Sequence, residues 1–207
     1  MTIEESYNKK SEYYDNYRKN APGWNDINLF LNNNLQDNIS ILDVGCGTGV
    51  FLEKLQKYNY KELHGIDPSK SMIEKSYDKT KYIDNCRVWQ DYIENIKDNS
   101  YDLIFCNQVI QNLTLNKKES LDTRNIFYEN LYRVLKDKGK LIITTRNIIN
   151  NYSDMYWYTD NDILKKSIDD MKSFVPSNLN YELKNINKFK KIYNIGNNDL
   201  IYKNKYY

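Results

Sequence analysis

The chain has few of the residues that build metal sites, disulfide networks and histidine-based active sites. Its 207 residues include three cysteines, one histidine, seven glycines and three prolines. Cys46, Cys86 and Cys106 lie far apart, without the Cys-x-x-Cys spacing of zinc sites or the density of disulfide-linked domains. We therefore expect reduced, buried thiols and no bound metal ion.

Long hydrophobic runs and a strong charge of one sign are also missing. Nowhere do roughly 18 apolar residues follow one another, the length that a membrane-spanning helix needs. The first residues, MTIEESYNKKSEYY, are polar and contain no apolar core of a secretion signal. The formal net charge of +2 does not predict a nucleic-acid-binding surface. We expect a cytoplasmic protein with neither a membrane nor a nucleic-acid partner, and the oligomeric state is left open.

What the sequence does contain is an alternation of strand-like and helix-like apolar patterns. Strands are expected at Ile39–Val44, Glu62–Ile66, Cys86–Trp89, Tyr101–Cys106 and Lys140–Thr145. Helices are expected at Val50–Tyr58, Lys70–Thr80, Tyr92–Ile96 and Glu119–Leu135. Lys138-Gly139 should stop the last of these helices. Such an alternation predicts a doubly wound α/β fold, with helices on both faces of a mostly parallel sheet.

The segment after the fifth strand is expected to complete this sheet. A helix is predicted near Asp160–Ser173, with Asp160 or Asn161 as its cap. Two further strands are predicted at Tyr181–Tyr193 and Asp199–Lys203, because the asparagine- and glycine-rich residues between them favour a hairpin. The sheet should therefore have seven strands, with an antiparallel strand at its edge.

The N-terminal residues carry a different pattern. Residues 1–35 are expected to be helical and amphipathic, with a break at Ala21-Pro22-Gly23 and a concentration of aromatic side chains. No repeat or flexible linker separates them from the rest of the chain. We expect a single domain over residues 1–207, in which 1–35 form a helical cap and 36–207 form the α/β core.

A glycine turn after the first expected strand is the clearest candidate for a binding site. Gly45, Gly47 and Gly49 separate that strand from the next helix, where backbone N–H groups are open to a ligand. A dinucleotide site would need a small third residue where Val50 stands, and no Gly-Lys-Ser/Thr follows as in a P-loop. The carboxylate of Asp43 would repel a pyrophosphate but hold an ammonium group, directly or through water. The turn favours a nucleoside without phosphates that carries an amino acid; a glycine turn without a ligand is the alternative.

Two more carboxylates follow expected strands. Asp67 ends the second strand, where doubly wound sheets present an acid to ribose hydroxyls. Pro68 fits the turn into the next helix, and a plain helix cap is the alternative role of Asp67. Asp91 precedes Tyr92 after the third strand, and an acid there can accept a hydrogen bond from the exocyclic amine of adenine. Together these acids favour a ligand that contains adenosine.

The successive motifs of this chain resemble those of class I S-adenosylmethionine-dependent methyltransferases. In chain order they are DVGCGTG, GIDPS-x-x-MIE, the Asp-Tyr pair after the third strand, YDLIFCNQVIQNL and LYRVLKDKGKLIITT. The resemblance spans about residues 39–146, with a weaker match in the N-terminal YDNYR. It implies a Rossmann-like fold, S-adenosyl-L-methionine as cofactor and S-adenosyl-L-homocysteine as product.

The resemblance also implies a set of cofactor-contacting residues between the N-terminal segment and the end of the fourth strand. They are Tyr13, Tyr17, Arg18, Asp43, Gly45, Cys46, Gly47, Asp67, Pro68, Met72, Asp91, Tyr92, Asn107 and Gln108. Asp43 and the glycines would meet the methionine end, Asp67 the ribose, and Met72 and Asp91 the adenine. A position in the core is the alternative for Met72. Asn107 would lie near the sulfonium. The three N-terminal residues would fold over the site, with an amphipathic surface helix as an equally expected alternative.

For the reaction, the sequence departs from a common pattern of these enzymes. Many relatives that act on small molecules carry histidines after the fourth strand, where this chain has amide side chains; its one histidine, His64, lies on the second strand. Amides orient a polar substrate but take up no proton at neutral pH. Catalysis should therefore depend on proximity and in-line orientation, without a histidine base. The candidate catalytic or substrate-contacting residues are Asn107, Gln111, Arg146, Tyr156 and Tyr158.

The leading prediction for function is methyl transfer to a small polar molecule. The absence of an Asn-Pro-Pro-Tyr/Phe motif argues against adenine bases and glutamine amides as acceptors. An alternative is attack on another carbon of the sulfonium, such as cyclisation of the aminobutyrate arm with release of methylthioadenosine. A third is a module that binds the cofactor without catalysis.

Overall fold

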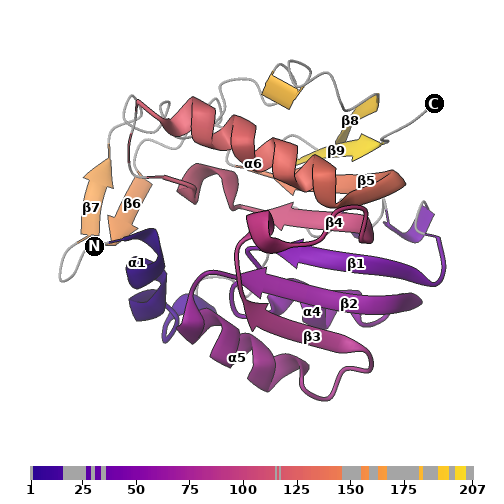
Figure 1. Ribbon diagram of the computed structural model, residues 1–207. Coiled ribbons are helices and arrows are strands. Elements are labelled where there is room, and N and C mark those ends of the chain that lie inside the picture. Colours follow the sequence, from indigo (N-terminus) through magenta and orange to yellow (C-terminus); the bar gives the residue numbers. More distant parts are fainter. Residues whose placement is uncertain are drawn as a thin grey trace.

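The computed structural model shows a central sheet with helices packed against it (Figure 1). It describes residues 2–15, 27–28, 31–33, 36–114, 116, 118–145, 155–158, 163–166, 182–183, 191–195 and 199–203. The helical elements are α1 (Ile3–Lys10), α4 (Val50–Leu55), α5 (Lys70–Thr80), α6 (Ser120–Val134) and the short 3-10 turns η1 (Ile93–Asn95) and η2 (Ile110–Asn112). The strands of the main sheet are β1 (Ile39–Val44), β2 (Tyr60–Asp67), β3 (Cys86–Gln90), β4 (Tyr101–Asn107), β5 (Leu135–Thr144), β8 (Lys191–Ile195) and β9 (Asp199–Lys203).

The main sheet has the strand order β3-β2-β1-β4-β5-β9-β8. The five strands from β3 to β5 are parallel, with Leu42 opposite His64 and Ile104 opposite Leu141. β9 pairs with β5 in the antiparallel direction, and β8 pairs with β9. The predicted α/β fold with a parallel sheet is thereby confirmed. Because the strand order reverses between β1 and β4, a ligand site is expected at the carboxyl ends of these strands.

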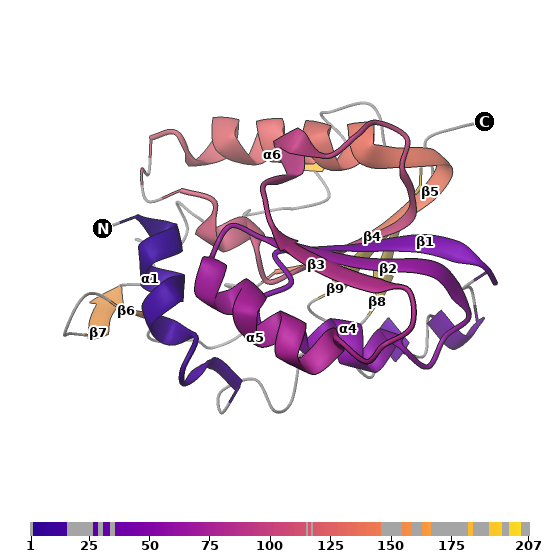
Figure 2. The same cartoon turned by 60° about the horizontal axis from the view of Figure 1, so that its bottom comes forward.

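Helices cover both faces of the sheet because strand side chains alternate between the faces. In Figure 2, α6 lies above the sheet, and α4 and α5 lie below it. Leu42 and Ile104 belong to a buried cluster that includes Leu131 of α6. Ile41 belongs to a second buried cluster that includes Leu52 of α4. The core thus occupies the two faces and leaves the strand ends available for a site.

The junction between α6 and β5 differs from the prediction. The helix ends at Val134, and Leu135 is already extended and begins β5. Lys138 has a positive φ of 63°, and the register of β4 with β5 shifts between Tyr101 and Leu103. The prediction that Lys138-Gly139 stops the helix is therefore wrong. These two residues lie at an irregularity inside β5. The buried Leu135 pairs with Tyr101, and this tertiary contact ends the helix early.

Two predictions in the C-terminal part are also corrected. Ile163–Lys166 forms strand β7, which pairs antiparallel with β6 (Met155–Tyr158), so the helix predicted near Asp160–Ser173 is wrong over these residues. Glu182 and Leu183 are helical and β8 begins only at Lys191, so the strand predicted over Tyr181–Tyr193 is too long. At Ile163–Lys166 the pairing with β6, which the apolar pattern does not report, decides the conformation, as is common for strands.

The N-terminal helix α1 stands at the carboxyl ends of the strands (Figure 1, Figure 2). It begins with a capping box, in which the Thr2 side chain accepts from Glu5 N–H at 3.1 Å and Glu5 Oε2 accepts from Thr2 N–H at 2.7 Å. No residue of α1 is buried. The predicted break at Ala21-Pro22-Gly23 lies outside the described residues. None of the described helices is both long and apolar enough to cross a bilayer.

Candidate functional site

The turn after β1 adopts a backbone conformation that favours glycine. Gly45 and Gly47 have φ values of 71° and 54°, in the left-handed region. The N–H groups of Gly45 and Cys46 both donate to the carbonyl of Ile66 in β2, at 2.8 and 3.0 Å. A Cβ added to Gly45 would lie only 2.4 Å from Cγ2 of Val109. The turn is therefore held tightly between β2 and the segment that follows β4.

The end of β2 is connected to this turn through Asp67. Its Oδ2 accepts a hydrogen bond from Gly47 N–H at 3.0 Å, and its Oδ1 accepts one from Ser69 N–H at 2.9 Å. Burial raises the pKa of Asp67 to about 6. The hydrogen bonds from the Ser69 and Gly47 N–H groups lower this pKa, but the effect of burial is larger. A carboxylate has about four acceptor positions, so both oxygens can accept further bonds from a ligand.

Asp43 lies behind the glycine turn, at 2% exposure. Its Oδ1 has no hydrogen-bond partner. Among the described residues, it is the one buried side-chain oxygen or nitrogen atom without such a partner. Burial, reinforced by the nearby charge of Asp67, raises the pKa of Asp43 to about 7. An unpartnered buried carboxylate is unfavourable by itself, and it indicates that a positive or hydrogen-bonding group completes the site.

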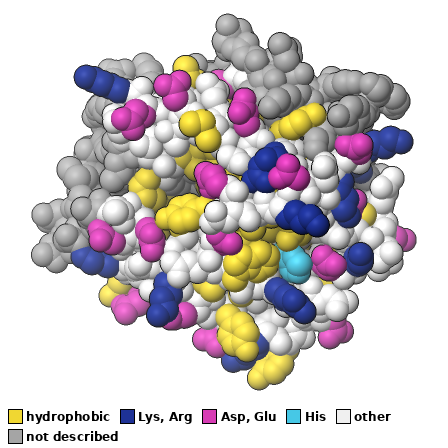
Figure 3. All heavy atoms as spheres, in the orientation of Figure 1, with side chains coloured by type: hydrophobic (Ala, Val, Ile, Leu, Met, Phe, Trp, Pro, Cys, Tyr) yellow, Lys and Arg dark blue, Asp and Glu magenta, His cyan; other side chains and the backbone are white. Residues whose placement is uncertain are grey.

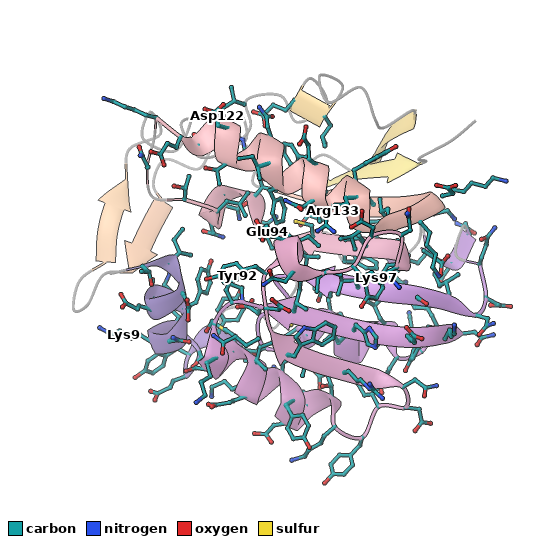
Figure 4. All side chains as sticks on the ribbon, in the orientation of Figure 1. Lys9, Tyr92, Glu94, Lys97, Asp122 and Arg133 are labelled. Carbon is teal, nitrogen blue, oxygen red and sulfur yellow. The ribbon has the colours of Figure 1, made fainter. Side chains whose placement is uncertain are left out.

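The turn after β3 presents a third carboxylate. Asp91 accepts from the side chain of Asn95 at 2.7 Å, from Tyr92 N–H at 2.8 Å and from Trp89 Nε1 at 3.2 Å. Burial opposes ionisation of Asp91, but these three donors outweigh it and lower its pKa. Arg133 of α6 fastens the following turn, because its guanidinium donates to the backbone carbonyls at 93, 94 and 96. Figure 4 shows Tyr92 and Glu94 on this segment, beneath α6 in the view.

These three turns border a cavity of about 710 Å³, a volume in the usual range for small-molecule sites. The opposite walls come from α1, from the segment after β4 and from α6, and include the apolar side chains of Leu113 and Phe127. Among the described residues, every charged side chain on the wall is acidic: Glu4, Asp67, Asp91 and Glu94. Hydrophobic and acidic side chains lie side by side on this face of the molecule (Figure 3). The cavity therefore suits a ligand with an apolar part and a positive charge.

Amide side chains lie on the wall at the end of β4. Asn107 Oδ1 accepts a hydrogen bond from the hydroxyl of Thr144, the last residue of β5. Gln108, with a φ of 59°, also contacts this hydroxyl through Nε2 at 3.3 Å. Gln111 lies behind them, almost fully buried, and donates to the Gln108 carbonyl at 2.9 Å. Asn107 and Gln108 thus reach the cavity in fixed positions, whereas Gln111 supports them from behind.

The N-terminal segment forms the remaining wall and touches each of the three turns. Asp15 accepts from the hydroxyl of Thr48 in the glycine turn. Asn8 Oδ1 accepts from the hydroxyl of Ser69 at 2.7 Å, and Glu4 Oε2 accepts from the Tyr92 hydroxyl at 3.2 Å. None of these three acceptor side chains is predicted from the sequence. Thr2 and Glu5 signal the start of a helix, but nothing in the sequence says where that helix docks.

The structure brings most of the predicted cofactor residues to the cavity wall. Those on the wall are Gly45, Gly47, Asp67, Pro68, Asp91, Tyr92, Asn107 and Gln108. Met72 is instead fully buried in the core, and Tyr13 is 61% exposed and not among the wall residues. Cys46 is buried within the glycine turn, and Asp43 is buried behind it. Tyr17, Arg18 and Arg146 lie outside the described residues, and Tyr156 and Tyr158 are placed on β6 without a described side chain.

Comparison with known proteins now identifies the family. A model of the methyltransferase domain matches residues 35–197, more than half of the chain. The chain belongs to this methyltransferase domain family. The resemblance of its motifs to class I S-adenosylmethionine-dependent methyltransferases is thereby confirmed.

Individual methyltransferases match over shorter stretches. A malonyl-[acyl-carrier protein] O-methyltransferase of Ilyobacter polytropus is 27% identical over 146 residues, or 69% of this chain and 51% of that protein. EEF1A lysine methyltransferase 2 of Homo sapiens is 29% identical over 124 residues, or 56% of this chain and 52% of that protein. The chain thus spans about half the length of these curated relatives.

Solved methyltransferase structures share the fold of this chain. The N-methyltransferase NodS of Bradyrhizobium japonicum, solved in complex with S-adenosyl-L-homocysteine, superposes with a TM-score of 0.69. The two sequences are 16% identical, and the match covers 100% of both chains. A methyltransferase from Aquifex aeolicus superposes with a TM-score of 0.64 at 18% identity, over 95% of this chain and 97% of that one. At such identities the likeness concerns the fold.

Proposed function

We propose that the cavity binds S-adenosyl-L-methionine and that the protein transfers its methyl group to a small polar molecule. The observation that carries this proposal is the pair of buried acids behind and beside the glycine turn, Asp43 and Asp67. The cofactor has an ammonium and a sulfonium charge and no phosphate, which fits an acidic wall without described Lys, Arg or His. A dinucleotide would bring two phosphates into the same acidic surroundings.

Each part of this cofactor has residues that suit it. The free acceptor positions of Asp67 suit the ribose hydroxyls, and Asp91 suits the adenine amine. The methionine end would occupy the glycine turn at Gly45 and Gly47, with its ammonium held by Asp43 directly or through water. Pro68 and Tyr92 would border the ribose and adenine. Residues 1–35 would act as a lid, and β9 with β8 would complete a seven-stranded sheet.

The bound cofactor supplies a methyl group that the sulfonium has already activated. The protein therefore has to align a nucleophile with the S–CH₃ bond and exclude water, and alignment contributes roughly 7–11 kcal/mol in favourable cases. Asn107 and Gln108 are suited to orienting a polar acceptor, since the Thr144 hydroxyl holds both in place. Gln111 would fix Gln108, and we propose Arg146, Tyr156 and Tyr158 as further acceptor contacts.

A small acceptor is supported by the walls of the cavity. Apart from its acids and apolar residues, the wall carries neutral amides and hydroxyls, among them Asn107, Asn112, Asn116 and Thr123. The related enzymes named above act on a malonyl-carrier protein and on a protein lysine, so their names do not define one acceptor class. Incubation of a cell extract with methyl-labelled cofactor tests this point. Label should appear in the small-molecule fraction; label in protein or RNA would contradict a small acceptor.

Binding is tested by titration calorimetry with S-adenosylhomocysteine. Asp67→Ala removes two ligand contacts as well as the bond to Gly47, so its Kd should rise by at least about 100-fold. Asp137→Ala, which removes an exposed carboxylate on β5, is the matched control and should bind like the wild type. Equal affinities of the two variants would contradict the proposed site.

The product of the reaction distinguishes methyl transfer from its alternatives. Methyl transfer leaves S-adenosylhomocysteine, whereas cyclisation of the aminobutyrate arm leaves methylthioadenosine. Chromatography of the nucleosides after incubation with cofactor and extract should show S-adenosylhomocysteine. Methylthioadenosine would contradict methyl transfer, and binding without turnover in any extract would favour a non-catalytic module.

A further inference from the structure

A tryptophan at the end of β3 holds one carboxylate of the cavity wall from outside the cavity. β3 is the edge strand of the main sheet (Figure 1). Asp91, directly after this strand, is a wall residue, whereas Trp89 is not. The indole Nε1 of Trp89 donates to Asp91 Oδ2 at 3.2 Å. Trp89 therefore reaches the cavity only through Asp91.

The hydrogen bonds of Asp91 leave about one acceptor position for a ligand. An ionised carboxylate has about four such positions, two on each oxygen. Oδ1 accepts from Tyr92 N–H at 2.8 Å and from Asn95 Nδ2 at 2.7 Å, which fill both of its positions. Among the described residues, Oδ2 accepts from Trp89 alone. The open position is therefore on the oxygen that the indole holds.

The indole is itself fixed by aromatic residues of other strands. His64 of β2 meets it edge-on, with ring centroids 5.4 Å apart and an interplanar angle of 77°. His64 Nδ1 lies 2.7 Å from the hydroxyl oxygen of Tyr101, a buried residue of β4. Trp89 also packs against the buried cluster to which Tyr101 belongs. Because the ring is held on these sides, its N–H group has a fixed direction towards Oδ2.

We propose that Trp89 is a positioning residue that aims Asp91 Oδ2 at the 6-amino group of the cofactor, and that it thereby makes the site selective for adenine over hypoxanthine. This inference rests on the proposed function, which assigns Asp91 to that amine. Adenine has a hydrogen-bond donor at position 6, whereas hypoxanthine has a carbonyl oxygen there and its donor at N1. A carboxylate that could turn would accept from either base. One that is held in place accepts from adenine and is left facing an oxygen of hypoxanthine.

The test compares S-adenosylhomocysteine with S-inosylhomocysteine, its hypoxanthine counterpart, by titration calorimetry. The wild type should bind the adenine ligand at least about tenfold more tightly. Trp89→Phe keeps an aromatic ring but removes the N–H donor, and should reduce this preference by about three- to tenfold. Tyr82→Phe also removes a polar group from an aromatic side chain, at a position that is 87% exposed. It is the matched control and should keep the wild-type preference.

A double-mutant cycle separates positioning from a merely structural role. Asp91→Ala removes the carboxylate and should abolish most of the preference for adenine. If Trp89 acts through Asp91, Trp89→Phe should change the preference no further in the Asp91→Ala background. An unchanged preference in Trp89→Phe alone, or an equal weakening of both ligands, would overturn the inference. So would an equal loss of preference in both backgrounds.

The wild-type protein offers a readout that needs no substitution. The indole N–H resonance of Trp89, assigned through the backbone of β3, should shift more with saturating S-adenosylhomocysteine than with saturating S-inosylhomocysteine. The reason is that only adenine donates to the oxygen that this N–H group contacts. Equal shifts would contradict the proposed role.

The outcomes distinguish this inference from the proposed function. A wild type that binds S-adenosylhomocysteine and S-inosylhomocysteine equally well overturns the selectivity alone. A wild type that binds neither S-adenosylmethionine nor S-adenosylhomocysteine overturns the proposed function, and the role of Trp89 with it. A preference that falls in Trp89→Phe only while Asp91 is present supports both.

Discussion

The cavity has two walls that are built in opposite ways. The strand-end wall consists of tight turns over the buried Asp43, in which Gly45 N–H donates to the Ile66 carbonyl and Gly47 N–H donates to the Asp67 carboxylate. The α1 wall has no buried residue in its helix and is held by side-chain contacts such as that of Asn8 to Ser69. The first wall can position a ligand precisely, because moving it would disrupt the sheet. The second can move without cost to the core, and is therefore suited to admitting and retaining a ligand.

The largest expected effect concerns the glycine turn of the strand-end wall. In Gly45→Ala the new Cβ would meet Val109 at 2.4 Å, at a φ of 71°, so we expect a loss of about 3 kcal/mol in unfolding free energy. In Gly47→Ala the new Cβ would lie 3.5 Å from Cε1 of Tyr14, so only the strain of about 1–2 kcal/mol at a φ of 54° remains. Urea denaturation measures both values.

A second substitution tests the cause of the larger effect. Val109→Ala in the Gly45→Ala background removes the colliding methyl groups and should recover part of the lost stability. Equal unfolding free energies for Gly45→Ala and Gly47→Ala would mean that the strand-end wall can rearrange to accommodate the new Cβ next to Val109.

The next effect concerns Asp43, beneath the same wall. Its pKa rises from 3.8 to about 7 on folding, so between these values the folded protein holds a proton that the unfolded chain has released. The contribution of Asp43 to the stability of the ligand-free protein is therefore lost as the pH rises from about 4 to 7. Asp43→Asn has no such titration and should be more stable than the wild type at pH 8, by about 2 kcal/mol. Thermal denaturation at pH 5 and pH 8 measures this.

Cofactor affinity should rise with pH, whereas the stability of the ligand-free protein should fall. Below pH 7 the protonated Asp43 no longer attracts an ammonium group, so the wild-type Kd for S-adenosylhomocysteine should rise as the pH falls from 8 to 6. Asp43→Asn should bind about tenfold more weakly at pH 8. A variant that is more stable and also binds normally would show that Asp43 is not part of the site.

The smallest expected effect concerns the α1 wall. Tyr14 packs edge-on against Tyr7, with ring centroids 6.2 Å apart, and both line the cavity. Tyr14→Ala should weaken S-adenosylhomocysteine binding by about three- to tenfold, as expected for one aromatic contact, with little change in melting temperature. Tyr14→Phe keeps the ring and should bind like the wild type. A large drop in melting temperature for Tyr14→Ala would mean that the α1 wall is part of the core after all.

The two walls also differ in how far they could be predicted. Asp43, Gly45 and Asp67 belong to short local patterns in which a strand, a turn and a helix follow one another, and the backbone conformation comes from the residues themselves. The same is true of α5, whose predicted range Lys70–Thr80 is the observed one. By contrast, Glu4, Asn8 and Asp15 contact residues 33 to 88 positions away, and no local pattern reports such contacts.

The errors have a related cause. Met72 is fully buried, because its place on α5 turns it towards the core, so the alternative of a core residue fits it better than a contact with adenine. The local pattern predicts a helix where β7 lies, since the apolar residues of Ile163–Lys166 fit either element until their partner in β6 is known. Leu135 likewise leaves the helical pattern because it pairs with Tyr101.

The amino-acid sequence was sufficient to predict the α/β fold, the family and the chemistry of the strand-end turns. These depend on hydrophobic periodicity and on glycine and aspartate at fixed short spacings, which act within a few residues. The three-dimensional arrangement shows that Asp43 is buried and has one unpartnered oxygen, that every described charge on the cavity wall is acidic, and that residues 2–15 contact three strand-end turns. Burial, electrostatic surroundings and docking depend on what the folded chain brings together across the sheet, and a local pattern contains none of that information.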